Sequence, residues 1–147
     1  MKPRIFFDTN IMLDLIQERP GYQYAARLLQ MQEDGEITVC ISILSMANIA
    51  YVLRKTIPQN LIVQTLKQIS SIVEVIPMDN DQLQSALLME GPDFEDIMQA
   101  ACAASCSVGI VSEASMSSAI CSAVCTWLWF SDCTNSFFVF ILKKELK

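Results

Sequence analysis

The sequence predicts an α/β layered fold with a parallel sheet, because short apolar runs alternate with longer helical patterns along most of its 147 residues. This length suits one domain and is sufficient to bury a substantial core. With 52% hydrophobic and 18% charged residues, the chain is too apolar for intrinsic disorder. We therefore expect residues 1–147 to form a single domain.

The expected strands are four short apolar runs, RIFF (4–7), ITVCIS (37–42), IVEVIP (72–77) and VGIVS (108–112). Helical patterns occupy 21–35, 43–56, 58–70, 79–90 and 93–105, and a shorter helix is expected from about Ile11. Gly35 is a stop signal, and Pro58 suits a helix start. Because helical segments separate the strands, the strands are expected to pair in parallel.

Charge and composition exclude several function classes. The net charge is −6 and the pI is about 4.5, so nucleic acid would have to be bound through local cations or a bound metal. The sequence contains no His, the commonest catalytic base and transition-metal ligand. Serine-protease and zinc-hydrolase chemistry are therefore disfavoured.

The six cysteines are expected to be reduced thiols in a cytoplasmic protein, because the N-terminal MKPRIFFDTN lacks the apolar stretch of a signal peptide. Cys102 and Cys106, like Cys121 and Cys125, are four residues apart and lack the CxxC spacing of zinc sites. A structural zinc site is therefore not expected.

The composition changes after residue 111. Residues 112–147 are rich in Ser, Cys and aromatic residues and show no clear period. The stretch 119–142 is long enough to span a bilayer, but Asp132, Asn135 and several hydroxyl residues interrupt it, so a membrane anchor is disfavoured. We interpret 112–147 as a divergent or frameshifted tail, which resequencing of the coding DNA would test.

Two groups of acids occupy positions where ligands bind in open parallel sheets. Asp8 directly follows the first expected strand, and Asp93, Glu95 and Asp96 lie at the start of the helix 93–105. Each also has a purely structural explanation, because Asp is a common N-cap and acids are stabilised at helix N-termini. If the carboxylates converge, their repulsion must be relieved by protons or by a cation, and hard oxygen ligands favour Mg²⁺ or Mn²⁺.

Three segments together carry a resemblance to a known family: IFFDTNIMLDLI, ISILSMANIAYVLRK and DFEDIMQAACA. In this order and spacing, over residues 3–111, they resemble the PIN-domain family, especially its VapC-like bacterial toxins. The resemblance implies a three-layer α/β/α sandwich with a central parallel sheet. It also implies a Mg²⁺- or Mn²⁺-dependent endoribonuclease, often a homodimer inhibited by an antitoxin protein.

The resemblance assigns roles to individual residues. Asp8 and Asp96 match metal-binding, catalytic acids, with Asp93 assisting; Asn10 matches the small polar residue that orients the first acid. Asn48 stands where many members have an acid on the middle helix, and could support a metal through water. Glu95 is expected to face outward.

A second departure follows the fourth strand, where the family pattern is Thr, any residue, then Asp or Asn. This chain has Ser112, Glu113 and Ala114 there, so only Glu113 offers a substitute acid. These departures leave open a catalytically impaired module that binds an antitoxin-like partner through its early helices. An aspartyl phosphatase of the haloacid-dehalogenase type is disfavoured, because it needs an acid at position 10.

Candidate RNA contacts are few. Lys2, Arg4, Arg54 and Lys55 are available cations, although solvated charges at helix or strand ends are the favoured explanation. Tyr22, Tyr24 and Tyr51 could stack on bases, but aromatics at helical spacing more often belong to a core.

Overall fold

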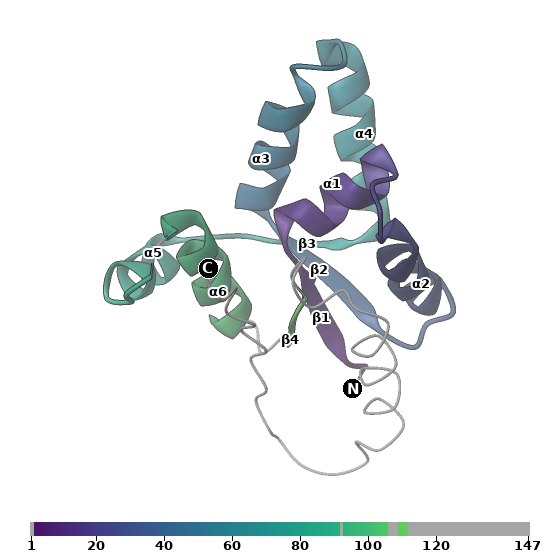
Figure 1. Cartoon of the computed structure of the whole chain (residues 1–147). Helices are drawn as coiled ribbons and strands as arrows, with labels where there is room; N and C mark the ends of the chain where they lie inside the picture. The colour runs from purple at the N-terminus through teal and green to yellow at the C-terminus, as the bar shows by residue number, and fades with distance from the viewer. Residues whose placement is uncertain (1, 92, 106–108, 112–147) are drawn as a thin grey trace.

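The computed structural model describes residues 2–91, 93–105 and 109–111 (Figure 1). Within these ranges the sheet has four parallel strands in the order β3-β2-β1-β4. Their bounds are β1 Arg4–Phe7, β2 Thr38–Ser42, β3 Glu74–Ile76 and β4 Gly109–Val111. All four predicted strands and their parallel pairing are thus confirmed.

The chain leaves β1 toward β2 and β3, then returns to pair β4 with the opposite side of β1. This reversal creates a switch point beside the carboxyl end of β1, where the connections leave in opposite directions. Open parallel sheets bind their ligands at such a point.

Six helices lie within the described ranges: α1 Thr9–Gln17, α2 Tyr22–Glu33, α3 Ile43–Leu53, α4 Gln59–Ile72, α5 Asn80–Leu87 and α6 Phe94–Ser105. Gly35 follows α2 with φ of 78°, which explains why glycine stands there. Asp79 caps α5 in a reciprocal capping box with Gln82. The helix α5 ends at Leu87 rather than Glu90, earlier than its pattern predicts.

The helices cover the two faces of the sheet unequally (Figure 1). Ile5 and Phe7 of β1 face the layer of α1 to α4, where most of the described buried apolar side chains form one cluster. Phe6 points the other way and packs in a smaller cluster that includes Cys102 and Ala103 of α6. This alternation along β1 produces the predicted three-layer α/β/α arrangement.

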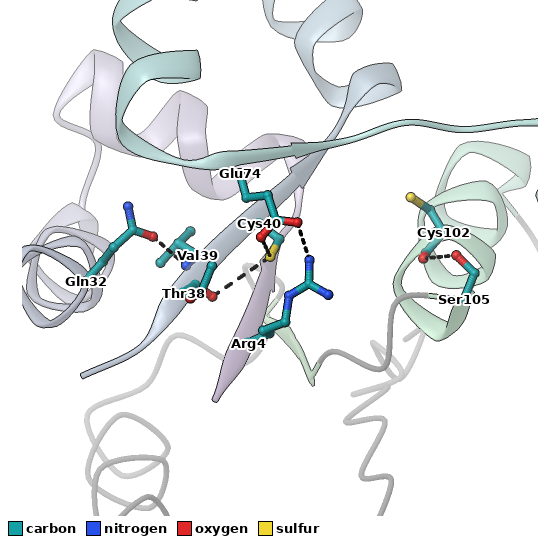
Figure 2. Close-up of polar contacts among 8 residues, drawn as sticks. All are labelled: Arg4, Gln32, Thr38, Val39, Cys40, Glu74, Cys102 and Ser105. Carbon is teal, nitrogen blue, oxygen red and sulfur yellow. Dashed lines mark hydrogen bonds and ion pairs between the residues drawn. The ribbon is translucent and has the colours of Figure 1, made fainter. Parts of the chain in front are cut away.

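The amino-end half of the sheet carries a polar cluster on the α6 side. Figure 2 shows Arg4 of β1, Cys40 of β2 and Glu74 of β3 side by side, with an ion pair between Arg4 and Glu74. Arg4 begins β1, whereas Asp8 follows its last residue. Arg4 therefore forms its ion pair at the end of β1 away from the acids, and its role as an RNA contact stays a prediction.

No helix in the described ranges is both long and apolar enough to cross a membrane. The expectations for the tail 112–147, including Glu113, fall outside the described residues.

Candidate functional site

Asp8 lies at the switch point, immediately after β1 and before the first residue of α1. It occupies the N-cap position with an extended backbone, at φ −67° and ψ 157°, but its side chain makes no capping hydrogen bond. Asp8 therefore occupies the position of a helix cap, but capping does not explain why a carboxylate stands there.

Asp93 behaves differently from Asp8. Its Oδ1 accepts the backbone N–H of Glu95 at 2.8 Å, just before α6 begins at Phe94. This is the capping bond that the structural explanation predicted for Asp93. The bond also fixes the first turn of α6, which carries Glu95 and Asp96.

Electrostatics place the two groups of acids together. Burial is the largest cause that raises the pKa of Asp8; the Thr9 backbone lowers it, and the negative charges of Asp96 and Glu95 raise it further. Burial also raises the pKa of Asp96, followed by the charge of Asp93. Asp8 and Asp96 are therefore electrostatic neighbours, although 88 positions of sequence, from 8 to 96, separate them.

A buried hydrogen-bond network lies beneath these acids. Its members are the buried polar side chains of the described chain: Thr9, Ser42, Ser45 and Gln99. The hydroxyl of Ser42 donates to Ser45 Oγ at 3.0 Å, and Ser45 donates to Gln99 Oε1 at 3.0 Å. Gln99 Nε2 donates to Thr9 Oγ1 at 3.2 Å, and Thr9 donates to Ser45 Oγ at 3.0 Å. The network thus ties α1, β2, α3 and α6 together.

Glu95 is exposed, as a residue that faces outward would be, but one of its carboxylate oxygens also contacts this network. Its Oε1 accepts from Asn48 Nδ2 at 2.6 Å and from Gln99 Nε2 at 3.1 Å. Thr9 Oγ1 lies 3.4 Å from the same oxygen. Asn48 accordingly uses its amide N–H on Glu95, a contact that the sequence pattern did not predict.

Asn10 stands apart from the network. Its side chain is exposed and forms no hydrogen bond to another described residue. Hydrogen bonds to the acids come instead from Thr9, Asn48 and Gln99. The orienting role that the resemblance assigns to Asn10 remains a prediction.

The donor chemistry fits a hard divalent cation. Asp8, Glu95 and Asp96 offer only carboxylate oxygens, and no described Lys or Arg forms an ion pair with any of them. Within the described ranges, however, no three His, Cys, Asp or Glu side chains converge closely enough to form a complete metal site. Asp8, Glu95 and Asp96 therefore have the ligand type that Mg²⁺ or Mn²⁺ prefers, but they do not form a complete coordination site in this structure.

Sequence reasoning missed the supporting residues Thr9, Ser45 and Gln99. A weak signal was present, because Ser42 and Ser45 have the spacing of a helix cap, and Ser42 does accept the N–H of Ser45 at 3.0 Å. Gln99 follows Glu95 by one helical turn, which places both side chains on one face of α6.

Comparison with known proteins agrees with this fold. No protein of curated function matches the sequence significantly. Among solved structures, VapBC2 from Rickettsia felis, bound to a promoter DNA fragment, has a TM-score of 0.55 at 19% identity, covering 73% of this chain and 84% of that chain. VapC20 from Mycobacterium tuberculosis, a sarcin-ricin loop cleaving toxin, has a TM-score of 0.58 at 16% identity, covering 82% of this chain and 94% of that chain.

At these identities the two likenesses establish the fold alone. The sequence itself matches the PIN domain family model over residues 4–113, which includes Asp8, Asn48 and the whole of α6. This match spans most of the chain and carries all three segments of the resemblance. The chain belongs to the PIN-domain family.

Proposed function

We propose that this protein is a Mg²⁺- or Mn²⁺-dependent endoribonuclease and the toxin component of a toxin–antitoxin system. The observation that carries the proposal is the position of Asp8 at the switch point of the sheet, where the negative charge of Asp96 is among the causes that raise its pKa. Family membership supports it, because PIN-domain proteins are typically metal-dependent ribonucleases.

Asp8 and Asp96 would hold the divalent ion. When bound, such an ion lowers the pKa of coordinated water and neutralises charge on the phosphodiester. Asp93 keeps Glu95 and Asp96 at the start of α6 through its bond to the Glu95 N–H, and assists with its remaining oxygen. Asn10, at the exposed rim of α1, is assigned to the orientation of Asp8 once RNA is bound.

The proposal also explains how an acidic protein binds a polyanion. With a net charge of −6, the protein repels RNA at long range, so the affinity must come from local positive charge. A divalent ion between carboxylates provides that charge where the phosphate must sit. Arg54 Cζ lies 3.7 Å from the ring centroid of Tyr51, an exposed residue of α3. Arg54 would offer a further cation, and Tyr51 a stacking surface.

The test is RNA cleavage by the purified full chain in Mg²⁺, in Mn²⁺ and in EDTA. Asp8→Asn and Asp96→Asn are expected to lower the rate more than about tenfold, since even outer-shell residues of metal sites are worth ~10–100-fold. Asp34→Asn is the matched control, because Asp34 is an exposed acid at the end of α2. Equal rates for the wild type and Asp8→Asn would exclude Asp8 from the mechanism.

A binding module without turnover is the second candidate, favoured by the neutral Asn48 on α3. The partner would be an antitoxin-like protein, as the VapBC2 complex suggests. An apolar groove between α1, α2 and α4, lined by Met12, Leu15, Ile16, Leu29, Ile69 and Ile72, is the surface we assign to it. Tight Mn²⁺ binding with no RNA cleavage would favour this candidate. A homodimer remains predicted for either function.

A further inference from the structure

We propose that the exposed end of α3, formed by Tyr51, Arg54 and Lys55, binds unpaired RNA beside the candidate site. Tyr51 and Arg54 would stack on a base, and Lys55 would contact a phosphate. The inference rests on the proposed nuclease and identifies the surface that would hold its substrate.

The first argument is the distribution of charge. The segment 37–73, which contains α3 and α4, has three cations, Arg54, Lys55 and Lys67, and no acid, although the whole chain carries a net charge of −6. Arg54 and Lys55 are exposed, and neither forms an ion pair with a described residue. Because a polyanion is attracted to local positive charge, this segment is the favourable surface for RNA on an acidic protein.

The second argument is the exposure of Tyr51. Tyr22 and Tyr24 are partly buried on α2, whereas the residue Tyr51 is 56% exposed on α3, so a place in the core does not explain it. Arg54 Cζ lies 3.7 Å from the centroid of the Tyr51 ring, which puts an aromatic ring and a guanidinium plane together at the surface. Both kinds of group stack on unpaired bases.

The third argument is the position of this surface relative to the acids. Asn48 Nδ2 donates to Glu95 Oε1 at 2.6 Å, so the middle of α3 meets the start of α6. Tyr51 follows Asn48 by three residues, a spacing that places both side chains on one face of the helix, about 4.5 Å apart along its axis. The hairpin of α3 and α4 extends away from the sheet (Figure 1), so α3 leads outward from the acids.

The surface fits a single strand better than a duplex. In a double helix the bases stack on one another, and an aromatic side chain reaches them only where they are unpaired. A single strand whose scissile phosphate lay at the acids would bring a neighbouring base to Tyr51 and a further phosphate to Lys55.

The experiment measures binding of the full chain to a fluorescein-labelled single-stranded RNA by fluorescence anisotropy, at low salt and in EDTA. Tyr51→Ala should weaken binding about fivefold or more, because it removes a stacking surface. Tyr51→Phe retains the ring and should bind like the wild type. Binding of a double-stranded RNA of the same length should be unchanged in Tyr51→Ala.

The cations are tested through salt dependence. Lys55→Ala should lower the slope of log affinity against log salt concentration by about 0.7, the value for one phosphate contact of a single strand. Arg27→Ala is the matched control, because Arg27 is an exposed cation on α2, and it should leave the slope unchanged. Thermal unfolding identifies any variant that has lost its fold; if Tyr51→Ala is such a variant, Lys55→Ala decides.

Three results would overturn the inference: no binding of single-stranded RNA by the wild type, unchanged binding in folded Tyr51→Ala, or an equal loss for the duplex. Unchanged RNA binding together with a lower mass of Tyr51→Ala in light scattering would assign this surface to contacts between copies of the chain instead.

Failure of the nuclease proposal gives a different pattern. If the wild type binds RNA through Tyr51 but cleaves none in Mg²⁺ or Mn²⁺, the RNA-binding surface stands without the nuclease. If the wild type cleaves RNA and Tyr51→Ala binds and cleaves it equally well, the nuclease stands without this surface.

Discussion

At the scale of single residues, Asp8 is the clearest case of a side chain that folding alone does not explain. It is partly buried beside other carboxylates, makes no capping bond, and has a raised pKa chiefly because of burial. The folded chain without a cation therefore loses stability by keeping this charge. Such a residue is a functional candidate on physical grounds.

Replacing Asp8 should reveal that cost as a dependence of stability on pH. The folded pKa lies above the ordinary value of 3.8, so the unfolded chain releases the proton first as the pH rises. The penalty is absent below the ordinary pKa, grows between the ordinary and the folded pKa, and is complete above the folded pKa. Asp8→Asn should therefore stabilise the metal-free protein at neutral pH.

Urea unfolding in EDTA at about pH 7 and about pH 3 measures this difference. The advantage of Asp8→Asn should shrink toward zero at the acidic pH. Asp34→Asn serves again as the control, since Asp34 lies outside the group of acids. A wild type as stable as Asp8→Asn at neutral pH would contradict the raised pKa.

At this scale the sequence singled out acids and overlooked amides and hydroxyls. Asp8 and Asp96 stood out because carboxylates at strand ends and helix starts are conspicuous in an apolar chain, and their roles at a metal site stay a prediction. Gln99 and Ser45 did not stand out, because the sequence does not show whether a polar residue is buried or exposed. The contact of Glu95 with Asn48, 47 positions earlier, was not predicted, because the pattern of α6 alone cannot show it.

At the scale of elements, the start of α6 combines a helix cap with the acids of the site. Asp93→Ala should destabilise the protein by about 0.5–2 kcal/mol, the usual cost of losing a cap. Asp93→Asn should cost little, because asparagine accepts the same N–H. Chemical unfolding of both variants checks this prediction.

The same two variants separate the structural role of Asp93 from its assigned metal role. Weaker Mn²⁺ binding in Asp93→Asn, without a loss of stability, would support a role as a ligand, whereas unchanged binding would leave Asp93 as a cap alone. Asp79→Ala is the matched control: Asp79 caps α5 through the N–H groups of Asp81 and Gln82 and should lower stability without changing metal affinity.

Most elements followed from local signals. The four strands were visible as apolar runs, and Gly35 and Asp79 marked helix ends as they should. Pro58 precedes α4 as its N-cap rather than as its first helical residue. The early end of α5 at Leu87 and the order β3-β2-β1-β4 depend on tertiary packing, which no local pattern carries.

At the scale of the whole molecule, the candidate site joins two layers of unequal size. The described core between the sheet and α1 to α4 is much larger than the cluster that holds α6. Asp8 directly precedes α1, which belongs to the larger layer, whereas Glu95 and Asp96 belong to α6 on the other face. A shared cation would therefore link the layers across β1.

Amide hydrogen exchange should show this link. Without metal, α6 is expected to exchange faster than β1 and β2, because less of the described apolar surface holds it. Saturating Mn²⁺ should slow exchange in α6 more than in α4, which lies outside the site. Equal slowing everywhere would indicate global stabilisation, and no slowing in α6 would contradict a link through its acids.

Among the described residues, α6 shares fewer buried apolar contacts with the sheet than α1 to α4 do, which predicts an order of events on heating. The carboxylates of that helix can separate from Asp8 while the larger core stays intact, so the RNA cleavage proposed above should disappear at a temperature where circular dichroism still reports a folded chain. Cold-adapted or heat-tolerant versions of this protein would accordingly be distinguished less by their main core than by how firmly one helix is fastened to the sheet.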